Sequence, residues 1–103
     1  MELRHLKYFV AVAEEENVTR AASLLHVSQP PLSRQIRDLE EELGVKLFER
    51  KPQSLVLTPA GRVFLVEASA VLARAHEALR VAASLAGRRQ AEIRIGYAPS
   101  LTV

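Results

Sequence analysis

Two helical patterns meet within residues 25–36, which read Leu25-His26-Val27-Ser28-Gln29-Pro30-Pro31-Leu32-Ser33-Arg34-Gln35-Ile36. The earlier pattern spans about Val18 to Leu25, and its adjacent alanines Ala21 and Ala22 permit a close crossing with another helix. Residues 26–28 form a short break, and a helical pattern resumes at residue 29. Two helices joined by so short a turn predict a helix-turn-helix.

The helix after the break is predicted over about residues 29–43. Its apolar positions recur at helical spacing, and they are Leu32, Ile36, Leu39 and Leu43. Gly44 is expected to end this helix, because glycine is the favoured residue just beyond a helix C-terminus. With Leu32 taken as the inward direction, the residues that project outward are Pro30, Arg34 and Arg37, with Gln29 and Ser33 on a flank.

The start of this helix carries an unusual cap. Ser28 is followed by Pro30 and Pro31, which lack the backbone N–H groups that a capping serine normally satisfies. The sequence therefore predicts a free Ser28 hydroxyl, which we interpret as a contact to a DNA phosphate. The proline rings would offer apolar surface to a thymine methyl group in the major groove. Taken singly, each proline is better explained as part of a stiffened helix start, and each arginine as a solvated charge. Together, after a turn of this kind, they favour DNA binding.

An amphipathic helix is predicted ahead of this pair, from Leu3 to Ala13. It runs into Glu14-Glu15-Glu16, which we read as a solvated face. Because three glutamates sit at the unfavourable end of a helix dipole, Asn17 in a left-handed conformation is the expected stop. Either Asn17 or Thr19 is available to cap the following helix.

After Gly44 the pattern changes to short strands. Residues 45–50 and 54–57 alternate as strands do, around a connection of Lys51-Pro52-Gln53. Two strands alone are marginal, so we expect them to pack on the helices as a wing. The predicted fold is therefore mainly α: a winged helix-turn-helix of three helices and a two-stranded wing, followed by a long helix.

The long helix is predicted from Pro59 to Ala86, with Thr58 as its cap and a break at Gly87. One apolar stripe with coiled-coil-like spacing consists of Leu65, Ala68, Leu72, Ala75, Leu79 and Ala82, and a second of Phe64, Val71, Ala78 and Leu85. Two stripes need two partners, which we interpret as the domain's own core and a second copy of the chain. The expected organisation is residues 1–58 as the DNA-binding domain, 59–87 as a linker and dimerisation helix, and 88–103 as a hinge through residue 90 followed by a strand over residues 91–97.

Composition narrows the class of function. The chain has 103 residues and no cysteine, and no apolar run is long enough for a spanning helix, so we expect a cytoplasmic protein without a membrane partner. The histidines His5, His26 and His76 lie on separate predicted segments, so we expect neither an enzyme nor a metal or cofactor site. Residues 1–57 hold eight Lys or Arg against nine Asp or Glu, so the DNA hypothesis depends on local placement rather than net charge.

An ordered set of motifs resembles the LysR-type transcriptional regulators and covers essentially the whole chain: Leu3-Arg4-His5-Leu6-Lys7-Tyr8-Phe9, Thr19-Arg20-Ala21-Ala22, His26-Val27-Ser28-Gln29-Pro30-Pro31-Leu32-Ser33-Arg34-Gln35-Ile36, Leu39-Glu40-Glu41-Glu42-Leu43-Gly44, Leu47-Phe48-Glu49-Arg50 and Leu57-Thr58-Pro59-Ala60-Gly61. The resemblance implies a winged helix-turn-helix, a linker helix that pairs in a homodimer, and an effector domain of periplasmic-binding-protein type. Residues 91–103 resemble only the first strand and loop of that domain.

The resemblance also implies roles for individual residues. Those matching positions that approach bases are Gln29, Pro30, Pro31, Ser33 and Arg34, and those matching phosphate contacts are Thr19, Arg20, Ser28 and Arg50. Arg37 joins the backbone group because it projects outward. Many family members carry arginine at the wing tip, where this chain has Lys51-Pro52-Gln53, so a minor-groove contact would fall to Lys51 or Gln53.

The partners implied are double-stranded DNA, read as an inverted repeat with one copy of residues 29–43 in each major groove, and RNA polymerase. For full-length members of the family, the resemblance also suggests tetramers. The double proline and the first sixteen residues are similar to regulators of aromatic-compound breakdown, which suggests an aromatic acid as effector. The competing hypothesis is a helical oligomerisation module whose functional surface is the long helix.

Overall fold

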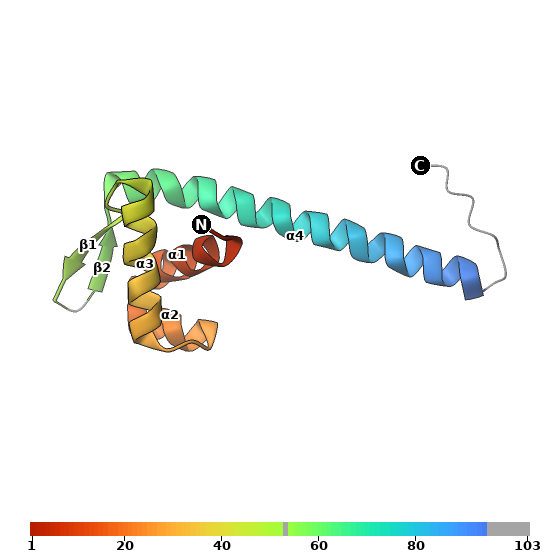
Figure 1. Cartoon of the computed structure of the whole chain (residues 1–103), viewed down its shortest axis with the longest axis horizontal. Coiled ribbons are helices and arrows are strands. Elements are labelled where there is room, and N and C mark those ends of the chain that lie inside the picture. The colour runs from red at the N-terminus through yellow and green to blue at the C-terminus, as the bar shows by residue number, and fades with distance from the viewer. Residues whose placement is uncertain (53, 95–103) are drawn as a thin grey trace. The chain divides into compact units, whose positions relative to one another are not determined.

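The structure, a computed structural model, describes residues 1–52 and 54–94 of the chain. The chain divides into two units, Met1–Leu72 and Ala73–Val103. The elements are α1 (Leu3–Glu15), α2 (Val18–Leu25), α3 (Gln29–Leu43), β1 (Phe48–Lys51), β2 (Ser54–Leu57) and α4 (Pro59–Arg94). The predicted fold class, a mainly helical winged helix-turn-helix followed by a long helix, is confirmed (Figure 1).

The core of the first unit is built around Phe9 of α1. Its ring centroid lies 5.4 Å from that of Phe48 and 5.0 Å from that of Phe64, both in tilted arrangements. Leu32 and Ile36 of α3 are buried against the same cluster. One aromatic side chain thus joins α1 to the first strand and to the start of α4, while the inner face of α3 closes the core over it.

The caps of the helices in this unit differ from those expected at one place, the end of α1. Glu16, rather than Asn17, takes the left-handed conformation that ends α1, and its N–H donates to the Val12 carbonyl. Asn17 is extended and caps α2, because its side-chain oxygen accepts from the Arg20 N–H at 2.9 Å. The predicted left-handed Asn17 is therefore wrong, since capping the next helix requires an extended backbone there.

The wing is a single antiparallel pair with Phe48 opposite Leu57 and Lys51 opposite Ser54. Buried Leu55 anchors it to the core, and its N–H donates to the Glu16 carbonyl at 3.2 Å. The first strand begins at Phe48 and not at Val45 as the alternation predicts, and Lys51 belongs to the strand rather than to the turn. Gln53 lies outside the described residues.

Glu40 gives the physical reason why residues 45–47 are not a strand. Its Oε2 accepts hydrogen bonds from the backbone N–H of Leu47 at 2.7 Å and of Phe48 at 3.2 Å. The carboxylate thus takes up N–H groups that a longer strand would have offered to a neighbour. This half-buried side chain ties α3 to the start of the wing, a role that a stretch of three glutamates did not single out.

Replacing Glu40 by alanine is therefore expected to lower the free energy of unfolding by about 2 kcal/mol, because two charge-assisted hydrogen bonds to partly buried N–H groups are lost. Urea unfolding followed by circular dichroism measures the change. The matched control is Glu41→Ala on the neighbouring exposed position, which should stay within about 0.5 kcal/mol of the wild type. Equal losses in the two variants would contradict this role of Glu40.

The first turn of α4 is held tightly against residues 46 and 47. The Thr58 hydroxyl accepts from the Gly61 N–H at 2.9 Å, as the predicted cap requires, and donates to the Lys46 carbonyl at 2.7 Å. The Thr58 N–H donates to the Leu47 carbonyl at 2.9 Å. A Cβ atom at Gly61 would lie only 2.1 Å from the Leu47 carbonyl oxygen, so this close approach requires glycine.

α4 continues beyond the predicted break. It includes Gly87 and extends to Arg94, so the expected hinge at residues 88–90 and the first part of the expected strand at 91–97 are wrong. The last three residues of that strand prediction lie outside the described range. A single glycine costs a helix about 1 kcal/mol, which the favourable helix formers around Gly87 offset. Within the part of the chain that the structure describes, no helix combines the length and the apolar character needed to cross a membrane.

Candidate nucleic-acid interface

The turn between α2 and α3 is fixed by backbone hydrogen bonds. His26 adopts a left-handed conformation with φ of 58°, and its N–H donates to the carbonyls of both Ala22 and Ser23. The next N–H, of Val27, donates to the Ala22 carbonyl at 3.0 Å. This pattern is that of a helix C-terminus closed by a left-handed residue, which sets the direction in which α3 leaves.

Ser28 is the N-terminal cap residue of α3, and its side chain makes no capping hydrogen bond. The prediction of a free hydroxyl is confirmed, because Pro30 and Pro31 occupy the first turn of the helix. Ser28 is exposed, so its hydroxyl is accessible at the positive end of the α3 dipole. A negatively charged group such as a phosphate fits that position.

The outward face of α3 changes its charge along the helix. Pro30, Arg34 and Arg37 are exposed, and neither arginine has a hydrogen bond or ion pair to another described residue. Pro31 and Ser33 are half-buried. From residue 38 onward the helix is acidic, with Asp38, Glu40, Glu41 and Glu42. Only the N-terminal half of α3 therefore suits a polyanion.

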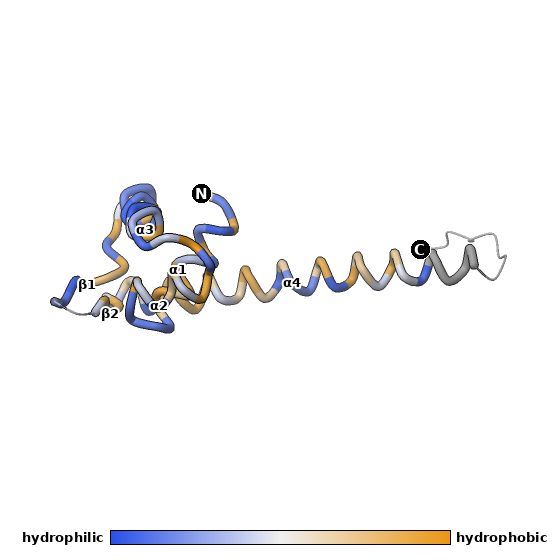
Figure 2. Tube along the Cα trace, turned by 90° about the horizontal axis from the view of Figure 1, so that it is seen from below, coloured by the Kyte–Doolittle hydropathy of each residue, from blue (hydrophilic) through white to orange (hydrophobic). Residues whose placement is uncertain are grey.

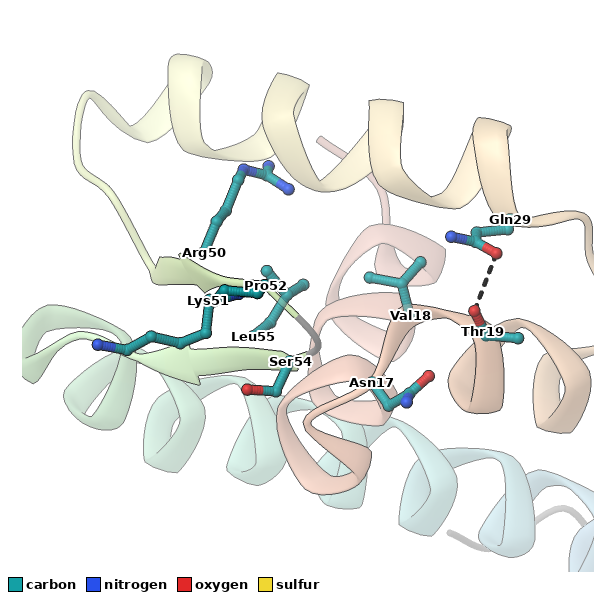
Figure 3. Close-up of a pocket in the computed structure, with 9 residues that line it drawn as sticks. All are labelled: Asn17, Val18, Thr19, Gln29, Arg50, Lys51, Pro52, Ser54 and Leu55. Carbon is teal, nitrogen blue, oxygen red and sulfur yellow. Dashed lines mark hydrogen bonds between the residues drawn. The ribbon is translucent and has the colours of Figure 1, made fainter.

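The structure brings four of the predicted residues, one from α2, one from α3 and two from β1, to one groove with a volume of about 320 Å³ (Figure 3). Thr19 and Gln29 line its helical side, and Arg50 and Lys51 line its β1 side. The remaining lining residues were not among the predicted site residues, and only two of them, Asn17 and Ser54, have polar side chains; the others are Val18, Pro52 and Leu55. The polarity of Asn17 and Ser54 alone gave no signal, because turn residues are commonly polar.

A side-chain hydrogen bond crosses from α2 to α3 at this groove. The Thr19 hydroxyl donates to Oε1 of Gln29 at 2.9 Å, and both residues are exposed (Figure 3). Sequence reasoning assigned Thr19 to a phosphate and Gln29 to a base. The structure adds a direct link between the two side chains.

The other predicted backbone residues are more scattered. Arg20 points toward Glu15, with Nε 4.0 Å from Oε1, and both it and Arg50 are exposed. Arg50 and Lys51 stand on neighbouring positions of β1, so their side chains leave on opposite faces of the wing (Figure 3). The wing therefore presents a cation on each face.

The predicted dimerisation stripe of α4 divides into two parts. Leu65 is half-buried against the domain's own core and Ala68 is 1% exposed, so Ala68 has no surface left for a second chain. Leu79 is 68% exposed, and Ala82 is exposed beside it. Leu72 and Ala75 are half-buried. Figure 2 shows apolar positions recurring along α4.

Comparison with known proteins places the chain among bacterial regulators. Residues 3–62 match the family model described as "Bacterial regulatory helix-turn-helix protein, lysR family". The Hca operon transcriptional activator HcaR of Escherichia coli (strain K12) is 50% identical over 103 residues, which are 100% of this chain and 34% of HcaR. The chain thus spans about a third of the length of this relative.

Two solved structures of such domains with DNA are similar throughout most of the chain. The BenM DBD in its complex with catB site 1 DNA matches with a TM-score of 0.80 and 48% identity, covering 84% of this chain and 96% of that one. The CbnR DBD in its complex with DNA matches with a TM-score of 0.78 and 48% identity, covering 84% of this chain and 99% of that one.

Proposed function

Because the chain belongs to the lysR family of bacterial regulatory helix-turn-helix proteins, we propose that it reads an inverted-repeat DNA site as a homodimer, with α3 in the major groove. The observation that carries the proposal is the outward face of α3, where an apolar ring and two guanidinium groups precede an acidic half, and neither guanidinium is paired with another described residue. The similar BenM and CbnR domains, whose structures contain DNA, support it.

In this proposal the residues divide into two groups. Gln29, Pro30, Pro31, Ser33 and Arg34 approach base edges at the floor of the groove. Ser28, Arg20, Arg37 and Arg50 face the phosphates, which fix the register of the protein on the duplex. Lys51 of the wing lies toward the minor groove, where a cation is favoured by the negative potential of a narrow A·T tract.

Fluorescence anisotropy tests the proposal with the 103-residue chain, a labelled inverted-repeat duplex and a scrambled duplex. Binding is expected to be tighter to the repeat and to weaken on the order of 10³-fold between about 50 and 200 mM salt, since phosphate contacts release counterions. Association through the apolar stripe of α4 alone does not weaken with added salt. Absence of binding to a panel of repeats at low salt would favour the oligomerisation module instead.

Arg34→Ala is expected to weaken binding to the preferred repeat at least about tenfold and to reduce its advantage over the scrambled duplex. The reason is that a bidentate arginine–guanine contact contributes about 1–3 kcal/mol of discrimination. Arg37→Ala, one turn further along the same face, is the comparison variant. It should weaken binding to both duplexes alike and lower the salt slope by about two, because the dimer loses one phosphate contact in each half-site. Identical behaviour of the two variants would contradict the division of roles.

We further propose that the full-length protein couples DNA binding to a small-molecule effector held outside these residues, and that residues 59–87 act as the linker between the two functions. The chain spans about a third of HcaR, which leaves room for such a domain in proteins of this family. We propose an aromatic acid as this effector, because the double proline and the first sixteen residues are similar to those of regulators of aromatic-compound breakdown. Thermal stabilisation of the full-length protein by benzoate-type acids, with no shift for the 103-residue chain, tests this assignment.

A further inference from the structure

We infer that Thr19 is a positioning residue for base recognition: its hydroxyl holds the Gln29 side chain so that the amide N–H groups face the DNA. The inference rests on the proposed DNA-reading function and adds a determinant of specificity to it. It replaces the phosphate contact that the sequence resemblance assigned to Thr19.

The geometry gives the first argument. Thr19 lies in the first turn of α2 and Gln29 is the first residue of α3, so their hydrogen bond spans the turn of the helix-turn-helix. Among the described residues, one other pair of side chains is hydrogen-bonded, Glu77 and Arg80, and both of these lie within α4. The bond from Thr19 is therefore the sole side-chain hydrogen bond that joins two different secondary-structure elements of the described chain. A threonine is well suited to this role, because branching at Cβ restricts its χ1 angle.

The donor and acceptor chemistry gives the second argument. A threonine hydroxyl that donates to Oε1 of Gln29 occupies one lone pair of the amide oxygen and leaves both Nε2 hydrogens free. A glutamine left to rotate can present either its oxygen or its nitrogen to a base edge. A glutamine held by its oxygen presents donors, which match acceptors in the major groove such as guanine N7 and O6, adenine N7 or thymine O4.

The surroundings give the third argument. Gln29 is exposed, so packing does not fix its long side chain, and the backbone carries it at the very start of α3. A flexible side chain must lose rotamer freedom on binding. The hydroxyl of Thr19 removes part of that freedom before DNA arrives, and this preorganisation strengthens both affinity and the preference for one base.

The test is selection of binding sites from a duplex library in which the inverted repeat is randomised, followed by anisotropy on the selected duplex and its single-base variants. The wild-type chain is expected to select an acceptor-rich edge at one position of each half-site, and Gln29→Ala should abolish that selection. Thr19→Val, which keeps the shape and removes the hydroxyl, should lower the preference for that base about fivefold. Thr19→Ser, which keeps a hydroxyl, should retain most of it.

A double-variant cycle separates the positioning role from a structural one. In the Gln29→Ala background, Thr19→Val should leave the base preference unchanged, because Thr19 acts only through Gln29. If Thr19→Val weakens binding equally on every duplex in both backgrounds, Thr19 contacts a phosphate and the inference is overturned. Selection of a donor-only edge such as cytosine N4 by the wild-type chain would overturn it as well. Failure of the wild-type chain to select any repeat would refute the proposed function itself.

Discussion

Replacing Gly61 by alanine is expected to lower the free energy of unfolding by at least about 3 kcal/mol, which is a large share of the stability of a small domain. The new Cβ would lie 2.1 Å from the Leu47 carbonyl oxygen and 2.9 Å from Cδ2 of Leu57. The first of these atoms belongs to the backbone, and it already accepts a hydrogen bond from the Thr58 N–H. Relief therefore requires that α4 move away from residues 46 and 47.

Gly87→Ala is the matched control for this experiment. Gly87 lies inside the same helix with nothing within 4 Å of the added methyl group, so alanine should stabilise the protein by about 0.5–1 kcal/mol through its better helix propensity. Thermal or urea unfolding of the three proteins gives both values. A Gly61 variant as stable as the wild type would show that the close approach of α4 to Leu47 is absent in solution.

Introducing a charge at Leu79 is expected to have the largest effect on DNA binding. Leu79→Asp places a carboxylate in the exposed apolar stripe through which we propose that two chains pair. Loss of pairing makes the two half-sites bind independently, and the linked arrangement is worth about 10²–10⁴-fold in apparent affinity. Sedimentation should show a monomer, and anisotropy on the inverted repeat should show binding weakened by at least about 100-fold.

Ser84→Asp provides the control for that variant. Five residues along a helix amount to roughly 140° of rotation, so residue 84 carries the same new charge away from the stripe. Ser84 is exposed and already polar, and its variant should remain a dimer and bind the repeat within a few-fold of the wild type. Dissociation of both variants alike would indicate a general effect of charge on α4, and a monomeric Leu79 variant with unchanged affinity would refute pairing as the basis of tight binding.

An ion pair between Glu77 and Arg80 lies beside Leu79 and bears on the pH at which the two variants are compared. Arg80 donates to both carboxylate oxygens of Glu77, at 3.0 and 2.7 Å. This hydrogen bonding holds the pKa of Glu77 below its ordinary value and raises the pKa of Arg80. The pair therefore stays charged near neutral pH, so a change of buffer around neutrality should not alter the contrast between the two variants.

The sequence predicted the helices of the first unit well because their signals are local. The bounds of α2 and α3 follow from apolar periodicity, from the alanine pair and from Gly44, which has the positive φ of a helix cap. Ser28 was predicted correctly for a related reason, since two prolines remove the donors that its hydroxyl would need. Periodicity and backbone chemistry are both visible within a few residues.

The sequence predictions are wrong where tertiary contacts, or the helix propensities summed over many residues, determine the local structure. The first strand begins at Phe48 rather than at Val45 because the Glu40 carboxylate accepts hydrogen bonds from the backbone N–H groups of Leu47 and Phe48. Glu40 precedes Leu47 by seven residues. α4 continued past Gly87 because one glycine does not outweigh the helix formers on both sides. Ala68 faces the domain's own core, although spacing alone placed it with Leu79. The link from Thr19 to Gln29 likewise depends on how two helices cross.

The junction at residues 46–48 has a mechanical consequence. Glu40 of α3 holds the N–H groups of Leu47 and Phe48, while Thr58 holds the carbonyls of Lys46 and Leu47. Residues 46–48 are thus hydrogen-bonded both to α3 and to the first turn of α4, and the last of them is the first residue of the wing. A displacement of that turn is therefore transmitted through short hydrogen bonds to α3 and to the wing, the two elements that we propose face the DNA. We therefore expect a displacement of the first turn of α4 to shift α3 and the wing together.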